Sequence, residues 1–334
     1  MTRTRSVTVA VDAMGGDHAP EAVLEGVTAA LVADPLLLVA LVGPPEIVHP
    51  FAERHPSVTA VSASEVIGMD EHPAAAVRAK KDSSIVVGCR LVRDGRADAF
   101  FSAGNTGACM SAATLVMGRI EGVARPALAT ILPARDRRWI LLDVGANAEA
   151  TAEHLVQFAH MGAAYAKVVL GVPRPTVGLL SIGEEATKGT PLVQEAHGMM
   201  AENVPGFAGN VEGDDIPGGK TDVVVTDGFT GNVALKLMEG LARELLAQVK
   251  DALTSSAASK VAAAVLKPAL SRLRDDLDPD AVGGAPLLGV DGVCIIGHGS
   301  SGPRAVEAAL GVAATAVRGE LVAKIAHSLE CAAG

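Results

Sequence analysis

The sequence predicts an α/β fold: a three-layer α/β/α sandwich with a mainly parallel sheet. Short runs rich in β-branched residues alternate with segments of helical periodicity from one end of the chain to the other. This alternation is typical of βαβ units, which place parallel strands side by side. Apolar residues make up 49% of the chain, but aromatic residues only 2%. We therefore expect an aliphatic core between a sheet and Ala-rich helices.

Eight strands are expected, with helices between most of them. They lie near residues 6–11, 37–42, 97–101, 127–132, 139–143, 176–181, 222–225 and 293–296. The chain has 334 residues, which is enough for one large α/β unit or for two lobes that share a sheet. We expect residues 1–334 to form a single domain with a cleft between two lobes.

Residues 250–280 interrupt the alternation, because helical sequence continues there without a strand. Apolar residues, including Leu266 and Leu270, fall on one broad face of this segment, and basic residues lie nearby. Pro268 is expected to end one helix and begin the next. The segment is predicted to lie in a dimer interface or on a membrane surface, and the two can coexist at the tip of a dimer.

Charge and cysteine content exclude several classes of function. The formal net charge of -10 argues against a nucleic acid partner, because phosphate backbones require a basic surface. The cysteines are far apart and form no CxxC pair, which favours reduced thiols in a cytosol over disulfides or a zinc site. They are Cys89, Cys109, Cys294 and Cys331. The longest apolar run, residues 36–42, is far below the ~20 residues that span a bilayer. We expect a cytoplasmic protein without a metal or an organic cofactor.

Glycine-rich loops follow the first and third expected strands. In doubly wound sheets, ligands bind at the carboxyl ends of strands. Residues 12–18 contain Gly15 and Gly16, which allow close backbone approach, and lead into a helix whose free N–H groups can bind an anion. A tight turn capped by Asp17 is the alternative. Residues 102–107 offer bare backbone with hydroxyl and amide side chains, which can hold an oxyanion or simply cap a helix.

Three further loops carry candidate side chains. Residues 141–147 repeat the strand-to-helix pattern and end at Asn147. Lys188 lies between Thr187 and Gly189 at a helix start, where it can bind phosphate as a compact charge, although most lysines are simply solvated. Asp227 follows a strand, a position typical of catalytic acids.

Residues 297–302 match GxGxxG, follow a strand and open a helix. They do not predict a dinucleotide site, because only one long helix is expected after Gly302, whereas that fingerprint needs a second strand with an acid at its end. The loop is still expected to bind a phosphate or a carbonyl oxygen. His298 then either donates a hydrogen bond to that ligand or forms only structural hydrogen bonds.

Together these segments resemble the bacterial phosphate acyltransferase (PlsX) family over nearly the whole chain. The matching segments are residues 11–17, 80–84, 102–107, 142–147, 183–189, 209–213, 227–232, 283–289 and 298–301. Val282 departs from the family, which often has tyrosine there. The resemblance implies a fold similar to phosphotransacetylases and to isocitrate and isopropylmalate dehydrogenases. It also implies a homodimer, peripheral association with the inner face of the cell membrane, and supply of acyl phosphate to a membrane glycerol-3-phosphate acyltransferase.

The implied reaction forms acyl phosphate from fatty acyl-[acyl-carrier-protein] and inorganic phosphate, an early step of phospholipid synthesis. Phosphate is substantially dianionic near neutrality and a thiol leaves readily, so positioning and charge stabilisation should supply most of the rate. By this hypothesis Lys188 binds phosphate beside the 104–107 backbone, Asp227 and Asn232 orient it or relay a proton, and His298 and Ser300 stabilise the oxyanion. The substrate-binding residues are Asp12, Gly15, Gly16, Gly104, Asn105, Thr106, Gly107, Asn147, Ser300 and Ser301.

Alternative functions and docking surfaces stay open. A phosphotransacetylase that uses acyl-CoA would need nearly the same loops. A nicotinamide dehydrogenase fits less well, and a non-catalytic membrane scaffold leaves the polar loops without a purpose. An acidic carrier protein would need a local basic patch. One candidate patch is Arg78, Lys80 and Lys81, and the other is Arg135, Arg137 and Arg138.

Overall fold

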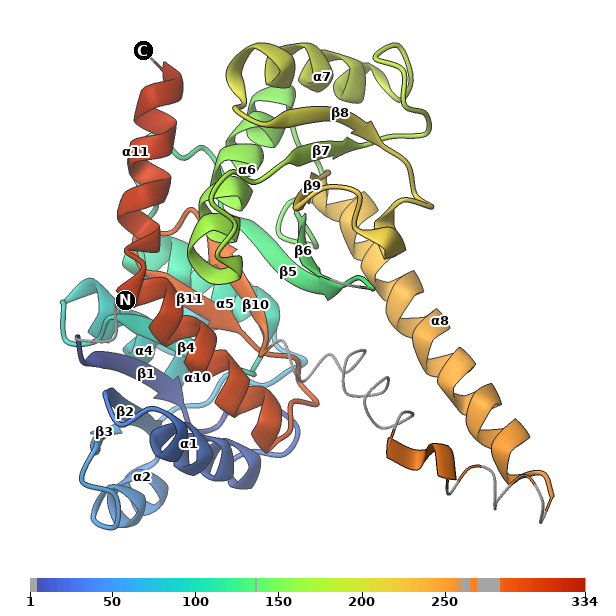
Figure 1. The fold of residues 1–334 in the computed structure, drawn as a ribbon. Helices are drawn as coiled ribbons and strands as arrows, with labels where there is room; N and C mark the ends of the chain where they lie inside the picture. The colour runs from blue at the N-terminus through green and yellow to red at the C-terminus, as the bar shows by residue number, and fades with distance from the viewer. Residues whose placement is uncertain are drawn as a thin grey trace.

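The computed structural model describes residues 5–135, 137–256, 259, 263, 265–268 and 283–333. These residues form one eleven-stranded sheet with the order β3-β2-β1-β4-β11-β10-β5-β6-β9-β7-β8 (Figure 1). The strands are β1 (Val7–Asp12), β2 (Leu37–Gly43), β3 (Val58–Ser62), β4 (Ala99–Ser102), β5 (Ala127–Pro133), β6 (Arg138–Leu142), β7 (Val177–Leu180), β8 (Phe207–Val211), β9 (Val223–Val225), β10 (Ala285–Leu288) and β11 (Val293–Ile296).

The eight predicted strands are confirmed to within about two residues at each end, and β3, β8 and β10 are additional. Two of the three have a sequence that weakens a strand pattern, since β8 contains Gly209 and β10 contains Pro286. Proline and glycine are both depleted in strands, so their presence hides strands that pair correctly in the folded sheet.

The direction of the strands divides the sheet into two parallel blocks. Strands β3, β2, β1, β4 and β11 form one block, and β6, β9, β7 and β8 form the other. Between them, the pairs β11–β10, β10–β5 and β5–β6 are antiparallel. Three successive reversals make the two blocks run in opposite directions. The carboxyl ends of the strands in one block therefore lie at the opposite end of the sheet from those in the other block. The loops that follow these strands are separated in the same way.

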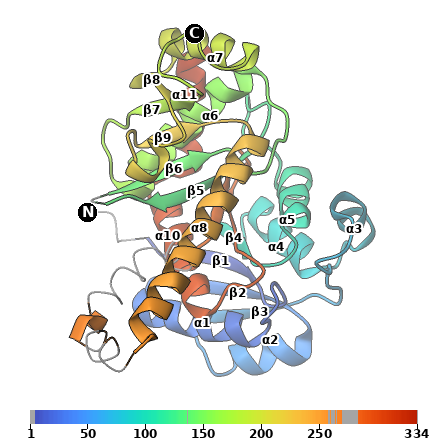
Figure 2. The same cartoon turned by 90° about the vertical axis from the view of Figure 1, so that its right-hand side faces the viewer.

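Helices cover both faces of the sheet, which gives the three layers predicted from the sequence (Figures 1 and 2). Side chains from one face form a core with α1 (Glu21–Ala33), α2 (Pro45–Ala52), α6 (Ala152–Tyr165), α7 (Pro191–Asn203), α10 (Pro303–Arg318) and α11 (Leu321–Ala333). Side chains from the other face form a second core with α3 (Pro73–Ala79), α4 (Ser84–Arg93), α5 (Thr106–Ala112) and the first turns of α8 (Gly228–Thr254). Short helical turns η1 (Ala113–Met117), η2 (Ala166–Leu170) and η3 (Ile216–Gly218) complete the fold.

Helix α8 leaves the sheet after β9 and extends away from the body of the protein (Figures 1 and 2). Its 27 residues correspond to about 40 Å of helix. The helical excursion predicted for 250–280 thus begins earlier, at Gly228. Residues 269–282, including Leu270, lie outside the described residues. In the part of the chain that is described, no helix combines the length and the apolar character that crossing a membrane requires.

The contact between α1 and α10 provides a test of the packing. A Cβ atom at Gly26 in α1 would overlap the Val306 side chain and lie 2.7 Å from the Pro303 carbonyl oxygen. We expect Gly26→Ala to lower the free energy of unfolding by about 1–3 kcal/mol, because the helices must separate. The control is Gly311→Ala in α10, where nothing lies within 4 Å. It should raise this free energy by about 0.5–1 kcal/mol. Urea denaturation measures both, and equal effects would contradict the packing.

Candidate functional site

A buried carboxylate at the end of β1 connects two glycine-rich loops. Asp12 is only 2% exposed. It accepts hydrogen bonds from the Ser102 hydroxyl at 2.7 Å and from the Met14 N–H at 3.0 Å. The Ser102 oxygen in turn accepts one from the Gly104 N–H at 3.0 Å. Burial raises the pKa of Asp12, although these hydrogen bonds act in the opposite direction. Asp12 therefore shapes the loops rather than facing a ligand.

The loops after β1, β4 and β11 lie against one another. A Cβ atom on Gly15 would lie 2.7 Å from the Gly104 nitrogen, so only glycine allows this approach. The N–H of Asp17 donates to the carbonyl of Gly299 at 2.7 Å. The structure thus brings Asp12, Gly15, Gly16 and residues 104–107 close to residues 298–301, because β1, β4 and β11 are neighbouring parallel strands.

Asn105 holds a fourth segment against this group of loops. Its amide nitrogen donates to the carbonyls of Gly68, Met69 and Glu71 at 3.1–3.2 Å. Its amide oxygen caps α5 by accepting from the Ala108 N–H at 3.0 Å. Both ends of the Asn105 side chain are therefore occupied, which favours the capping role over phosphate binding. Thr106, the first residue of α5, is exposed and is free of this constraint.

The loop after β11 contributes His298, Ser300 and Ser301. His298 and Ser300 are exposed, and the His298 Nδ1 lies 2.8 Å from the Ser300 hydroxyl oxygen. Ser301 is buried, and its N–H donates to the His298 carbonyl at 2.9 Å. Two helices, α10 and α11, follow this loop, rather than the one long helix expected. Glu320, with a φ of 54°, lies at the break between them. Residues 303–333 contain no strand, in keeping with the argument against a dinucleotide site.

Asp143, which the sequence did not single out, organises the loop after β6. Its side chain is buried and accepts hydrogen bonds from the backbone N–H groups of Leu128, Gly145, Ala146 and Asn147 at 2.7–3.2 Å. It also accepts one from the Asn147 amide at 2.9 Å. Burial raises the pKa of Asp143, against the effect of these donors. Its place directly after a strand and before Gly145 was the available signal.

The start of α8 packs on this loop. The Gly228 N–H donates to the Asn147 carbonyl at 2.7 Å, and a Cβ atom on Gly231 would overlap the Asp143 carbonyl. The Asn147 amide nitrogen also donates to the Pro126 carbonyl, so both of its N–H groups are engaged in structure. The exposed Asn232 donates to the Val144 carbonyl at 3.0 Å. Asp227 caps α8 by accepting from the Thr230 N–H at 2.9 Å.

Lys188 lies in the loop after β7, which a neighbouring asparagine supports. The Asn210 amide donates to the carbonyls of Gly183 and Glu185 at 3.1 and 2.9 Å, and His197 lies 3.0 Å from its oxygen. Glu184 forms an ion pair with Lys220. Lys188 itself is exposed, and its ammonium group makes no hydrogen bond or ion pair with the described residues. It is the kind of solvated cation that an anionic ligand can recruit.

The predicted site residues therefore form two groups. The first consists of the loops after β1, β4 and β11, and the second of the loops after β6, β7 and β9. Among the described residues, no hydrogen bond or ion pair joins the groups. That they face each other across one cleft stays a prediction.

Among the described residues, most of the thiols are buried and no cluster of metal-ligating side chains is found. No group of three or more His, Cys, Asp or Glu side chains there could hold a metal ion. All four cysteines are free, and Cys89, Cys109 and Cys294 are buried. Burial raises the pKa of Cys109 to about 12, so its thiol is a poor nucleophile.

Comparison with known proteins decides the family. A family model described as "Fatty acid synthesis protein" matches residues 7–324. The chain belongs to this family. The phosphate acyltransferase of Heliobacterium modesticaldum is 50% identical over 323 residues, covering 95% of this chain and 96% of that protein. The phosphate acyltransferase of Myxococcus xanthus is 48% identical over 330 residues, covering 97% of this chain and 94% of that protein. The family match thus extends across both parallel blocks.

Solved structures confirm the fold class of this family member. A phosphotransacetylase from Streptococcus pyogenes superimposes with a TM-score of 0.62 at 20% identity, covering 93% of this chain and 94% of that one. The EutD phosphotransacetylase from Staphylococcus aureus gives a TM-score of 0.61 at 17% identity, covering 93% of this chain and 94% of that one. The phosphotransacetylase-like α/β architecture predicted from the sequence is therefore confirmed, whereas the likeness to isocitrate and isopropylmalate dehydrogenases stays a prediction.

Asp143 provides a test of how the second group of loops is held. Asp143→Ala would leave four buried or half-buried N–H groups without their acceptor. We expect the free energy of unfolding to fall by about 3–5 kcal/mol. Asp143→Asn keeps an acceptor oxygen and should lose about half as much. Chemical denaturation measures both variants, and an alanine variant as stable as wild type would show that the loop does not depend on this carboxylate.

Proposed function

We propose that the protein transfers a fatty acyl group from acyl-[acyl-carrier-protein] to inorganic phosphate. The observation that carries the proposal is the identity of up to 50%, over nearly full lengths, to proteins named phosphate acyltransferase. In this reaction a phosphate oxygen attacks the thioester carbonyl and forms a tetrahedral oxyanion. The carbon–sulfur bond then breaks, acyl phosphate is released, and the carrier thiol takes up a proton.

The geometry of the loops supports this chemistry. Phosphate needs no strong base, and a thiolate needs no strong acid, so fixed donors and charges are the main requirement. Lys188 is the exposed cation of the second group, and Asn232 and Asp227 lie at the start of α8. In the first group, the exposed Thr106 and the exposed pair His298–Ser300 are the groups available to a ligand. The proposal requires the two groups to meet across a cleft, with phosphate on Lys188 and the oxyanion beside His298.

One assay tests the activity itself. Purified protein, acyl-[acyl-carrier-protein] and phosphate should release free carrier thiol, and hydroxylamine should trap the acyl phosphate as a hydroxamate. Replacing the donor by acyl-CoA distinguishes a phosphotransacetylase, which would use it equally well. Thiol release that does not depend on phosphate would contradict the proposal.

The role of Lys188 has its own test. Lys188→Ala should raise the KM for phosphate about 10- to 100-fold, because an ion-assisted hydrogen bond contributes about 1.5–3 kcal/mol. The KM for the acyl donor should change little. Lys167→Ala, which removes another exposed lysine, is the matched control and should leave both values unchanged. An unaltered phosphate KM in the Lys188 variant would remove this residue from the site.

For docking of the acidic carrier, we propose the surface formed by Arg78 and Lys81. Both are exposed, and neither side chain is engaged by a carboxylate of the described residues. They flank Lys80, which binds Glu71 in the segment that Asn105 holds against the first group of loops. In the other candidate patch, Arg137 is already engaged by Asp222 and the Gly219 carbonyl. Each patch thus has one cation in an ion pair, and the first is preferred because Asn105 ties its neighbouring segment to residues 102–107.

We also propose that two copies of the chain associate through α8. Six apolar side chains on this helix are spaced four residues apart and are 45–69% exposed. They are Phe229, Val233, Leu237, Leu241, Leu245 and Val249. Such a row forms a ridge that packs into the grooves of another helix, and this much exposed apolar surface is unusual for a monomer. A second copy offers an identical ridge, as a two-fold symmetric interface requires.

Replacing Leu237 and Leu241 by Glu should convert the dimer into a monomer, measured by light scattering after gel filtration. Buried charges in a helix–helix contact cost several kcal/mol. Lys236→Glu with Arg243→Glu places new carboxylates at polar positions of the same helix, and this control should remain dimeric. A dimer in the first variant would contradict the α8 interface.

For membrane association, we propose weak binding of the segment around Leu266 to anionic lipid, which would place the product near a membrane glycerol-3-phosphate acyltransferase at the inner face of the cell membrane. Val265 and Leu266 are 77% and 48% exposed, and Lys267 follows them. Leu266→Glu should reduce flotation of the full chain with anionic liposomes several-fold. Flotation equal to that of wild type, with the dimer intact, would contradict the proposal.

A further inference from the structure

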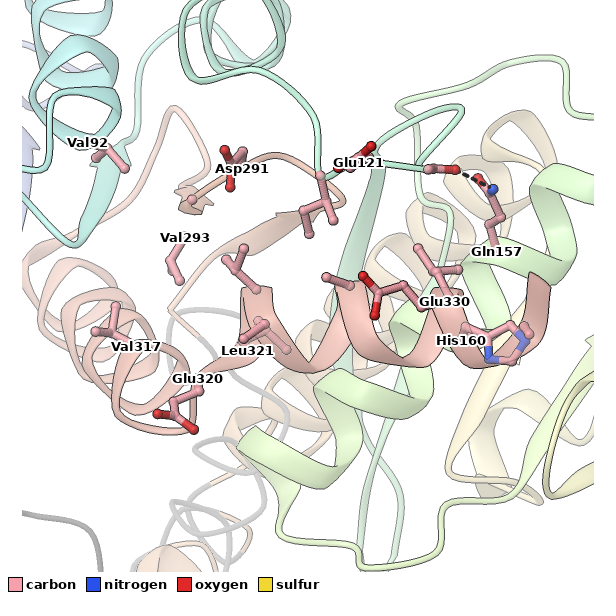
Figure 3. A pocket seen from close by; sticks show the side chains of 18 of the residues that line it. Val92, Glu121, Gln157, His160, Asp291, Val293, Val317, Glu320, Leu321 and Glu330 are labelled. Atoms are coloured by element: carbon pink, nitrogen blue, oxygen red, sulfur yellow. Dashed lines mark hydrogen bonds between the residues drawn. The ribbon is translucent and has the colours of Figure 1, made fainter. Parts of the chain in front are cut away.

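A groove of about 1140 Å³ lies away from both groups of loops, between α11, α6 and the segments that precede β4 and β11 (Figure 3). Sites for small molecules usually measure about 300–1,000 Å³, so this groove is large enough for a longer ligand. Its apolar lining includes Val156, Val293, Val317, Leu321, Val322 and Leu329. In the close view, Val317 of α10 and Leu321 at the start of α11 lie toward one side of the groove, and His160 lies toward the other.

Carboxylates surround this apolar lining. They are Asp98, Glu121, Glu153, Asp291, Glu320 and Glu330. Among the described residues that line the groove, Arg5 is the only lysine or arginine, and it is paired with Asp98 at 2.6 Å. Glu121, Asp291, Glu320 and Glu330 are exposed and form no ion pair with the described residues. The groove therefore carries several uncompensated negative charges around an apolar centre.

His160 adds a polar group that is not satisfied within the described residues. The side chain is 5% exposed and lines the groove, and its Nδ1 lies 3.1 Å from the Ser328 hydroxyl. Its Nε2 has no hydrogen-bond partner. This nitrogen is buried beneath the groove lining, so recognition in the groove depends on the apolar centre and the carboxylates.

We propose that this groove binds a basic amphipathic segment of another protein, most simply a helix that places its apolar side on Val322 and Leu329 and its Lys or Arg residues against the carboxylates. Charge complementarity selects this occupant. An anionic lipid surface, an acyl phosphate or an acidic carrier would be repelled by the same carboxylates. An apolar helix face fits an apolar groove, and basic flanking residues give orientation and speed of association. The interaction goes beyond acyl transfer and does not depend on it.

The test uses the full chain and a fluorescein-labelled peptide of about 18 residues, with Leu at i, i+3, i+4 and i+7 and Lys elsewhere. Fluorescence anisotropy should show saturable binding. Glu121→Lys with Glu330→Lys should raise the Kd at least about tenfold, since it reverses two charges at the groove. Ala323→Trp, at an exposed position that lines the groove, should also weaken binding by filling the space. Hydrogen exchange should slow in residues 321–332 when the peptide is bound.

Two controls separate this groove from general attraction to an acidic protein. Glu25→Lys with Glu53→Lys reverses two exposed carboxylates on α1 and beside α2, away from the groove, and should change the Kd less than about twofold. A scrambled peptide of the same composition, without an apolar face, should bind at least about tenfold more weakly. Equal Kd values for the two double variants, or equal binding of the two peptides, would overturn the proposal. Formation of acyl phosphate should be unchanged in the groove variants, so failure here is distinct from failure of the proposed function.

Discussion

The direction of the strands in the middle of the sheet determines where the rest of the protein can place its functional groups. Because β10 and β5 are antiparallel to both of their neighbours, the two outer blocks run in opposite directions. In a fully parallel sheet, all the glycine-rich loops would lie at the same end of the sheet, where the carboxyl ends of the strands meet. This sheet presents two groups of loops, each built on its own block. In the reaction that we propose, each group of loops binds one of the two substrates.

Each group of loops is organised by one buried carboxylate at the end of a strand, Asp12 on β1 and Asp143 after β6. Burial raises the pKa of both carboxyl groups, although the hydrogen bonds that they accept lower it. A carboxyl group whose pKa is higher in the folded state favours folding while protonated, and this contribution is lost as the pH rises through the folded-state pKa. At neutral pH, ionisation of Asp12 and Asp143 therefore opposes folding. Their value lies in fixing loop shape, which apolar residues could not do because backbone N–H groups need acceptors.

The sequence predicted most of the sheet but less of the site. Strands with β-branched runs were identified, whereas β10 was hidden by Pro286 and β8 by Gly209. Without β10, the reversal of direction between the two blocks could not be predicted from the sequence. Asn105 and Asn147 were recognised as polar loop residues, but their partners are carbonyl groups of Met69 and Pro126, far away in sequence. Propensity and spacing cannot predict such long-range hydrogen bonds, which depend on tertiary packing.

Charged side chains of opposite sign lie near the two ends of strand β4. Strand β4 leads at its carboxyl end to residues 102–107, near the Arg78 and Lys81 surface, while Asp98 just before its amino end belongs to the acidic groove. Four residues of strand span about 13 Å, which exceeds the Debye length of about 8 Å at physiological salt, so exposed charges at the two ends are largely screened from each other. Opposite charges at the two ends of so short a strand give the surface a local dipole although the whole chain is acidic. The carrier-docking surface and the acidic groove that we propose therefore lie near opposite ends of β4, and each attracts a partner of the opposite charge.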